Sequence, residues 1–484
     1  MKLTEFFLIS GLLTPLITSS LVYFFRRNAN LRDLMGPIGG IITFISACFI
    51  AQDVINGNTP TLKLVPLFPG VDFIFSVNPL GAIFGLVASF LWIAASIYTV
   101  GYMRGNNEKN QTRFAFFYAI AIHAAMGIAW SGNLLILFVF YEILTFSTYP
   151  LVTHKQTDDA KKAGRLYMSI LVGSSVVFLF PAILWVWYAS GTLNFSDGGI
   201  ISNNIPSKYL PFLLGLFAFG IGKAALMPIH KWLPAAMVAP TPVSALLHAV
   251  AVVKAGVFSI LIIVVYIFGY TNLLSSGASE WLIWLSSFTI IASSVVAISK
   301  DDLKARLAYS TISQLSYIVL GAALASTIAI QGAALHIVMH AVGKITLFFV
   351  AGVIYVSLHL TKVSELDGQG KSMPLVFLAF FIGSLSIIGV PPMGGSWSKL
   401  FLMLGAVQSE YLFIIVILCL STLLNVYYLL EIPARAFFKN KKKEIQVNMP
   451  IMAATPTVFT AFLTIVLFFY LEPFSKLIDL MVGK

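Results

Sequence analysis

The chain has 484 residues, of which 58% are hydrophobic and 10% charged, and its mean hydropathy is +0.91. Soluble domains are nearer to about 45–50% apolar and about 25% charged, so the composition excludes a soluble enzyme or a nucleic-acid-binding protein. A membrane-spanning helix needs roughly 20 apolar residues. We therefore predict an all-α polytopic membrane protein. It is expected to be embedded in the lipid bilayer and to bind no nucleic acid.

Long apolar windows follow one another from the N-terminus to the C-terminus, and their length predicts helices. About fourteen of them are present, so the chain is expected to cross the membrane about 14 times. They lie at about residues 4–25, 34–52, 78–102, 113–130, 132–153, 166–189, 209–229, 243–268, 281–299, 307–326, 329–357, 373–407, 411–437 and 449–470.

Basic residues alternate in density from one predicted loop to the next. The loops after odd-numbered spans hold 21 Lys and Arg residues, whereas the opposite side, termini included, holds five. Basic loops stay in the cytoplasm, so both termini are predicted on the non-cytoplasmic side of a cell inner (plasma) membrane. The 21 are Arg26, Arg27, Arg32, Arg104, Lys109, Arg113, Lys155, Lys161, Lys162, Arg165, Lys231, Lys300, Lys304, Arg306, Lys362, Lys371, Arg435, Lys439, Lys441, Lys442 and Lys443.

Five charged residues lie inside the predicted spans instead of the loops. They are Glu142, Lys223, Lys254, Lys344 and Lys399. An intramembrane charge costs several kcal/mol and usually faces a hydrated interior or a charged partner. Burial raises the pKa of a carboxyl group and a nearby ammonium lowers it again, so a carboxyl group under both influences can take up and release protons. The alternative is a static ion pair that only holds two helices together. The excess of lysine favours proton transfer over a purely structural scaffold.

Two spans carry helix-breaking residues beside a lysine. Pro228 follows Lys223, and Pro391 and Pro392 precede Lys399. Proline breaks a helix, and interrupted helices at membrane depth line hydrated cavities. Because these spans, 7 and 12, are five apart, we predict two inverted five-helix repeats with broken helices 7 and 12. The predicted divisions are 1–105 (helices 1–3), 106–270 (first repeat, helices 4–8), 271–438 (second repeat, helices 9–13) and 439–484 (basic loop and helix 14).

Histidines extend the set of candidate proton carriers. His336, His340 and Lys344 are four residues apart in turn, so they share one face of a helix, and histidine titrates near neutral pH. A metal site is the weaker interpretation of the two histidines, because no further ligand is evident. His248 and His123 are auxiliary candidates. His248 lies six residues before the nearest buried lysine, so the two are not expected to share a face.

Motifs for cofactors are missing from the sequence. Cys48 and Cys419 are far apart and cannot hold an iron–sulfur cluster, and they are expected to be packed thiols. No glycine-rich phosphate loop follows a strand pattern. We expect no cofactor, no metal and no redox centre in this chain, so any redox enzyme that it serves would need other subunits.

Several stretches between about residues 70 and 440 together resemble one family. It comprises the antiporter-like membrane subunits of respiratory complex I and the large subunits of Mrp-type multisubunit cation/proton antiporters, and the wording of spans 7 and 8 is nearest to the Mrp D subunit. The stretches are Phe140-Tyr141-Glu142, Thr148-Tyr149-Pro150-Leu151, Pro228-Ile229-His230-Lys231-Trp232-Leu233-Pro234, the run from Ala239 to His248, and the run from Asp302 to Gln314.

The resemblance implies proton transfer along a hydrated central axis. Glu142 and Lys223 would be its glutamate–lysine pair, and Lys399 its exit lysine, with the central carriers Lys254, His340 and Lys344 between them. It also implies other membrane subunits as partners, with protons and Na⁺ as the candidate ions.

Three functions stay open at this point. The leading one is a subunit of an Mrp-type cation/proton antiporter. The second is a proton-pumping subunit of a complex I-like NADH:quinone oxidoreductase or membrane-bound hydrogenase. The third, a stand-alone solute carrier, would need an aromatic and polar pocket for an organic substrate, which a row of lysines fits less well.

Overall fold

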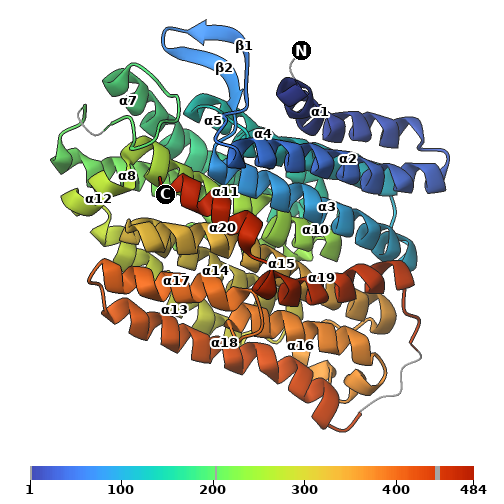
Figure 1. The fold of residues 1–484 in the computed structure, drawn as a ribbon. Coiled ribbons are helices and arrows are strands. Elements are labelled where there is room, and N and C mark those ends of the chain that lie inside the picture. The colour runs from blue at the N-terminus through green and yellow to red at the C-terminus, as the bar shows by residue number, and fades with distance from the viewer. Residues whose placement is uncertain (1–2, 202–203, 442–446, 484) are drawn as a thin grey trace.

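The computed structural model describes residues 3–201, 204–441 and 447–483, which are almost entirely helical (Figure 1). Among these residues, 12 helices are long and apolar enough to cross a membrane. They are α1 (Leu3–Phe24), α2 (Ala29–Ile55), α3 (Pro79–Gly105), α4 (Gln111–Ala129), α5 (Leu134–Val152), a composite of α6, η1 and α7 (Asp158–Ser190), a composite of α10, η5, α11 and η6 (Thr241–Phe268), α13 (Glu280–Ser299), α14 (Leu303–Leu324), α15 (Thr327–Leu358), α18 (Phe413–Phe438) and α19 (Ile451–Phe469). The predicted all-α polytopic membrane fold is confirmed.

Two further apolar helices are shorter, and they occupy the positions of the broken spans 7 and 12. They are the segment Ser207–Gly220, which contains α8 (Leu210–Gly220), and α16 (Pro374–Ile388). Irregular chain follows each of them before the next helix, α9 (Trp232–Ala235) or α17 (Gly395–Gln408). Together with the 12 longer helices, they account for the fourteen windows found in the sequence.

The first break begins earlier than the sequence indicates. Helix α8 ends at Gly220, well before Pro228, and a 3-10 turn, η3 (Gly222–Ala224), follows. At this end α8 packs closely on the π-helical segment η1 (Ser175–Leu179), where a Cβ on Gly220 would collide with the backbone nitrogen of Leu179. Lys223 therefore lies in the 3-10 turn within the break, not on an α-helix.

A β-hairpin projects from the helical body at the top of Figure 1, in the stretch between the second and third predicted spans. It pairs β1 (Thr61–Phe68) with β2 (Val71–Ser76) in an antiparallel ladder. Its turn needs Gly70, whose φ is +77° and whose Cβ would collide with the carbonyl oxygen of Gly191. The remaining short elements are η2 (Ser207–Tyr209), η4 (Ala236–Val238), α12 (Tyr270–Ser276), η7 (Val363–Glu365), η8 (Gln369–Lys371) and α20 (Glu472–Met481).

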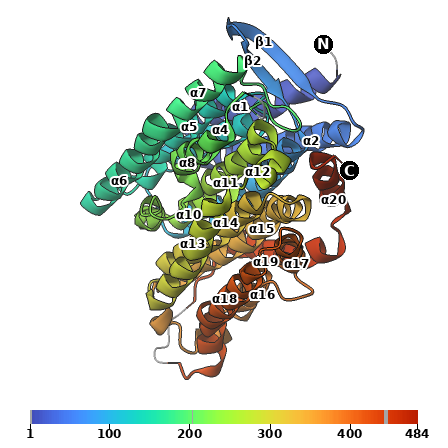
Figure 2. The ribbon, with the colours of Figure 1, turned by 90° about the vertical axis from the view of Figure 1, so that its left-hand side faces the viewer.

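The core of the molecule is formed by α11 (Val252–Ile262), α14 and α15. Figures 1 and 2 agree in placing these helices between α1–α5 on one side and α16–α19 on the other. The most apolar windows of Thr241–Phe268 and of α15 are entirely buried, against 39% for α1 and 33% for α18. Polar side chains on α11 and α15 are therefore shielded from lipid by protein.

Some basic residues that the sequence assigned to orientation also make ion pairs. Arg306 and Arg435 each lie 2.7 Å from a different oxygen of Glu431, and Arg435 also contacts Asp367 at 3.1 Å. This network ties α14 and α18 to the loop before α16. Four of the loop and terminal lysines fall outside the described residues: Lys2, Lys442, Lys443 and Lys484.

The prediction of packed thiols is wrong. Cys48 on α2 and Cys419 on α18 are both free and exposed. An apolar window does not tell which face of a helix meets other helices, and both cysteines fall on the outward faces of peripheral spans.

Candidate functional site

Lys223 is fully buried in the first break and is held by helix α5. Its Nζ donates to the carbonyl oxygen of Tyr141 at 2.7 Å and to Oγ1 of Thr145 at 2.6 Å. The same ammonium lies 3.1 Å from the centre of the Tyr141 ring, a cation–π contact. The Tyr141 hydroxyl also accepts from the backbone N–H of Lys223 at 3.1 Å. Sequence reasoning missed both partners, although their spacing of four residues on one helix was the available signal.

Glu142 lies beside this lysine without touching it. In the part of the chain that the structure describes, both of its carboxylate oxygens are buried and neither has a hydrogen-bond partner. Its carboxylate interacts electrostatically with the buried ammonium of Lys223. Among the described residues no hydrogen bond or ion pair joins the predicted pair, and two buried carboxylate oxygens without a partner can hold a proton or accept from a water molecule.

A row of buried polar side chains crosses the core, with a hydrogen-bonded contact at each end and two stacked histidine rings between them. Nε2 of His336 and Nε2 of His340 have no hydrogen-bond partner within the described residues. Lys254 on α11 places its Nζ 2.6 Å from Nδ1 of His340 on α15. The His340 ring is stacked on the His336 ring with centres 5.8 Å apart, and Nδ1 of His336 lies 2.8 Å from Oγ of Ser398 on α17. We call Lys254, His340, His336 and Ser398 the lysine–histidine row.

Lys399 stands at the far end of the row, next to Ser398. Its Nζ donates to the carbonyl oxygen of Ile388 at 2.9 Å and to Oγ1 of Thr422 at 3.3 Å. Ile388 is the last residue of α16, so the second break supplies the carbonyl that holds the ammonium. Tyr317 lies alongside, with its ring centre 5.0 Å from the same Nζ.

Lys344 leaves the row and points toward α14. Its Nζ donates to Oγ of Ser310 at 2.6 Å, and Ser310 also accepts from the hydroxyl of Tyr428 at 3.0 Å. The sequence placed His336, His340 and Lys344 on one helix face, and all three are buried on α15. Their side chains nevertheless contact three different helices.

His248 lies near the row in a π-helical segment, η5 (Leu246–Val250). Within the described residues neither of its ring nitrogens has a partner, and the ring packs on Phe348 with centres 4.5 Å apart. The expectation that His248 and Lys254 lie on separate faces assumed a regular α-helix. A π-turn changes that spacing, and both residues are electrostatic neighbours of His340.

A cavity of about 250 Å³ opens toward the basic-loop end of the same helix. Lys155, Lys304 and Asp302 line it, together with Thr241 and Tyr102. The buried hydroxyl of Ser244, one turn further along from Thr241, has no partner in the described structure. Ser244 and His248, both buried and without a hydrogen-bond partner in the described residues, thus lie on the helix segment that begins at the cavity.

His123 is not part of the row. Its Nδ1 lies 2.8 Å from the carbonyl oxygen of Leu12, and its ring packs edge-on against Phe140, so it joins α4 to α1 and α5. In the described ranges no group of three or more His, Cys, Asp or Glu side chains is arranged to hold a metal ion.

Fold and site together define a polytopic membrane protein with titratable cations aligned through its core. Residues 131–425 match the family described as NADH:quinone oxidoreductase/Mrp antiporter, TM. This match covers more than half of the chain, which therefore belongs to that family.

Relatives on both sides of the family resemble the chain. A Staphylococcus haemolyticus protein named "Putative antiporter subunit mnhA2" is 30% identical over 420 residues, 81% of this chain, and the chain spans only half (50%) of that relative's length. The N subunit of the NADH-quinone oxidoreductase of Desulforudis audaxviator is 30% identical over 400 residues, covering 81% of this chain and 78% of the relative. The D subunit of the Na⁺/H⁺ antiporter of Alkalihalophilus pseudofirmus is 26% identical over 470 residues, covering 96% and 93%.

Two solved structures share the fold along the whole chain. A chain of the Mrp complex from Dietzia superposes with a TM-score of 0.87 at 20% identity, covering 100% of this chain and 98% of that one. A chain of the membrane-bound sulfane sulfur reductase, an archaeal respiratory membrane complex, gives 0.85 at 24% identity, covering 99% and 98%.

Proposed function

We propose that the chain moves protons across a cell membrane as one subunit of an Mrp-type cation/proton antiporter. The observation that carries the proposal is the lysine–histidine row, because it places three titratable side chains in sequence through a lipid-shielded core. A proton shared between Nζ of Lys254 and Nδ1 of His340 can pass to either side along a 2.6 Å contact. Histidine accepts on one ring nitrogen and donates from the other, so it relays a proton without leaving its place.

In this proposal, repulsion between neighbouring protonated lysines sets the order in which protons move. Four lysines are buried in the spans, and the carboxylate near mid-span is that of Glu142. Neighbouring ammonium groups in a medium of low dielectric disfavour one another's charge. A proton gained at one station therefore promotes release at the next, which couples Lys223 and Glu142 at one end to Lys399 at the other.

We infer an uptake route from the basic-loop side. It starts in the cavity lined by Lys155, Lys304 and Asp302 and follows the hydroxyls of Thr241 and Ser244 to His248. Support comes from His248 itself, whose two ring nitrogens are buried and have no hydrogen-bond partner in the described residues. Water molecules between these polar groups would complete the route.

Transport by the whole complex in membrane vesicles tests the proposal. Lys254→Met keeps the length of the side chain and removes its proton site, and we expect proton movement to fall roughly a hundredfold, the usual effect of losing a positioned proton carrier. Lys208→Met removes an exposed lysine and serves as the control. Wild-type transport in the Lys254→Met complex would overturn the proposal.

A complex I-like redox pump is the second candidate, and the N subunit among the relatives favours it, because the alignment covers 78% of that protein. The proteins that purify with the chain separate the two candidates. Small membrane proteins alone support the antiporter, and hydrophilic redox proteins support the pump. Na⁺-dependent proton movement in vesicles tests Na⁺ as the second ion. A stand-alone solute carrier predicts transport by the purified single chain.

Orientation and internal symmetry belong to the same proposal. The division of 21 basic residues to one side and five to the other supports termini on the non-cytoplasmic side, and a periplasm-sensitive reporter fused at the C-terminus tests it. The two breaks beside Lys223 and Lys399 support inverted repeats over 106–270 and 271–438, with 1–105 and 439–484 as flanking segments. The test is a superposition of the helices in 106–270, turned upside down in the membrane, on the helices in 271–438. We expect the two sets to superpose.

A further inference from the structure

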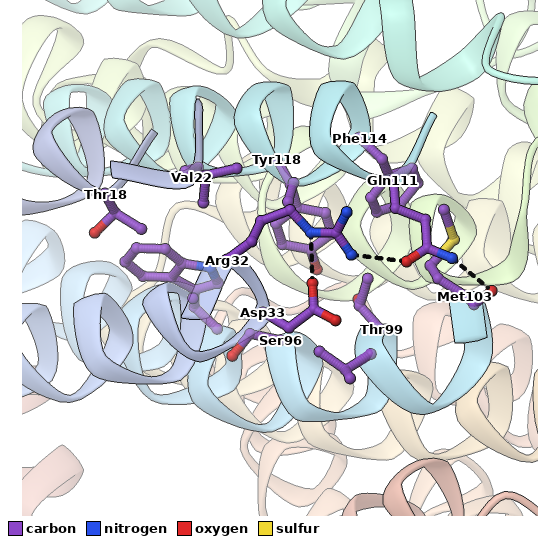
Figure 3. A pocket seen from close by; sticks show the side chains of 15 residues that line it. Thr18, Val22, Arg32, Asp33, Ser96, Thr99, Met103, Gln111, Phe114 and Tyr118 are labelled. Atoms are coloured by element: carbon purple, nitrogen blue, oxygen red, sulfur yellow. Dashed lines mark hydrogen bonds and ion pairs between the residues drawn. The ribbon is translucent and has the colours of Figure 1, made fainter. Parts of the chain in front are cut away.

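Buried cations are held in two different ways in this protein. Beside a cavity between α1, α2, α3 and α4, Figure 3 shows Arg32 bound to Asp33 at 2.7 Å and to Gln111 at 2.9 Å, so its charge has a carboxylate partner. Lys344 and Lys399 are also buried, but within the described residues they are bound by carbonyl and hydroxyl oxygens and no carboxylate is paired with them. Because a carboxylate partner favours the charged form of a cation, these two lysines lack the group that would keep a proton in place.

Helix α18 turns a stripe of polar side chains toward the core of the protein. Its outward face is apolar, and Leu423 and Val426 are exposed there. Ser421, Asn425 and Tyr428 are fully buried, and their spacing of four and three residues puts them on one face of the helix. Polar side chains inside a membrane are expensive and often mark the path of an ion or a proton.

One end of this stripe meets Lys344 through Ser310 of α14. Nζ of Lys344 donates to Oγ of Ser310 at 2.6 Å, and the hydroxyl of Tyr428 contacts the same Oγ at 3.0 Å and also contacts Oδ1 of Asn425. A hydroxyl has a single hydrogen, so Tyr428 can donate to Ser310 or to Asn425 but not to both at once. When Tyr428 donates to Asn425, its oxygen can accept the hydrogen of Ser310. The direction of these hydrogen bonds can therefore reverse, as a proton relay requires.

Lys399 stands at the other end of the stripe. Its Nζ donates at 3.3 Å to Oγ1 of Thr422, which lies three residues before Asn425 on α18. Residues three apart are neighbours on the surface of a helix. Nδ2 of Asn425 and the hydroxyl of Tyr317, whose ring centre is 5.0 Å from Nζ of Lys399, are buried without a hydrogen-bond partner in the described structure. Such groups hold buried water molecules, and one water would span the single turn between Asn425 and Thr422.

We propose a second proton route between Lys344 and Lys399, parallel to the lysine–histidine row. The inference rests on the proposed function. In one transfer Lys344 changes from ammonium to amine and Lys399 from amine to ammonium. Each group between them takes up one proton and releases another, so its own protonation state is the same before and after. We call this route the hydroxyl bridge, and it consists of the hydroxyls of Ser310, Tyr428 and Thr422 and a water molecule held by Asn425.

Proton movement by the whole complex in membrane vesicles tests the hydroxyl bridge. Tyr428→Phe removes the hydroxyl and preserves the ring, and Tyr427→Phe makes the same change on the exposed face of the same helix as the control. Tyr428→Phe and His336→Gln should each slow transport only about two- to fivefold, because the other route still conducts, whereas the double variant should lose roughly a hundredfold, the usual effect of losing a positioned proton carrier. A variant that only loosened the packing would slow transport by the same factor with or without His336.

A second pair of variants tests the bridge on α14. Ser310 and Ser316 are both fully buried, but the hydroxyl of Ser316 donates to the carbonyl oxygen of Ile312 on its own helix at 3.0 Å. Ser310→Ala should therefore slow transport as Tyr428→Phe does, including the larger loss in combination with His336→Gln. Ser316→Ala should transport as the wild type does.

The outcomes separate the bridge from the proposed function. If Tyr428→Phe transports like Tyr427→Phe, or if the double variant loses only the product of the two single losses, the bridge is overturned. A simultaneous loss of transport in Lys254→Met would show that the lysine–histidine row still carries protons. Normal transport in Lys254→Met would instead overturn the proposed function.

Discussion

The two broken helices carry the same kinds of residue but hold their lysines in different ways. In the first break, Lys223 lies in the irregular segment and is bound by another helix, through Tyr141 and Thr145 of α5. In the second, Lys399 lies on the helix after the break and is bound by Ile388, the end of the helix before it. Lys223 is therefore held by a neighbouring helix, whereas Lys399 is held by the helix end that the second break creates.

The comparison also concerns negative charge. Glu142 lies close enough to Lys223 to act on its charge, whereas no carboxylate in the described structure is paired with Lys254, Lys344 or Lys399. Glu142 and Lys223 at the first break are therefore a candidate acid–ammonium couple. Lys254, Lys344 and Lys399 instead contact carbonyls, hydroxyls and an imidazole. Removing the carboxylate of Glu142 should affect transport through the first site. Removing the hydroxyl that holds each lysine should affect transport to different extents at the two sites.

The largest expected effect concerns the couple in the first half. Glu142→Gln and Lys223→Met should each reduce proton transport in complex-containing vesicles roughly hundredfold, since each removes a proton site. The double variant should be no worse than either single one, because members of one unit are not additive. Glu410→Gln, on an exposed turn, is the control. Losses that multiply in the double variant would show that the two residues act separately.

Close packing around the breaks gives the next effect. A Cβ on Gly256 would collide with the carbonyl carbon of Lys223, and a Cβ on Gly395 would collide with the carbonyl oxygen of Ser386. Overpacking costs about 1–3 kcal/mol, so Gly256→Ala and Gly395→Ala should both lower the thermal midpoint of the complex. Gly173→Ala has open space around its Cβ and should not. Unchanged midpoints in the first two variants would contradict these contacts.

Thr145 and Thr422 offer a matched test of how the two lysines are held. Thr145 accepts from Lys223 at 2.6 Å, and Thr422 accepts from Lys399 at 3.3 Å. Valine preserves the shape of each, and a hydrogen bond to a charged group contributes about 1.5–3 kcal/mol when its geometry is good. Thr145→Val should slow transport roughly tenfold, and Thr422→Val should slow it less. Equal effects would remove the distinction between the two sites.

The smallest expected effect is at the end of the row. Ser398→Ala removes the 2.8 Å contact to His336 and leaves both Lys399 and the imidazole in place. We expect transport to slow a few-fold, the consequence of one neutral hydrogen bond of about 1 kcal/mol. Ser409→Ala, at the C-terminal end of the same helix, is the control. A loss as large as that of Lys254→Met would mean that Ser398 itself carries the proton.

Sequence patterns predicted the spans and the buried charges well because both depend on local composition. The fourteen windows, the lysines within them and the shared helix of His336, His340 and Lys344 needed only hydropathy and the helical period. The sequence does not locate the start of the first break, since α8 ends at Gly220, eight residues before Pro228. The hairpin was missed because its strands are short and lie between two strong helical signals.

The sequence by itself determined that this is a multi-pass membrane protein of the NADH:quinone oxidoreductase/Mrp antiporter family with charge inside its spans. Only the tertiary structure decided which of these charges meet. Lys254 and His340 are 86 residues apart and bond at 2.6 Å, whereas Lys344, on the same helix as His340, turns to α14. The reason is physical. Burial of a charge follows from the hydropathy around it, but its partner is set by how helices cross, and that depends on glycines, π-turns and breaks distributed along the chain.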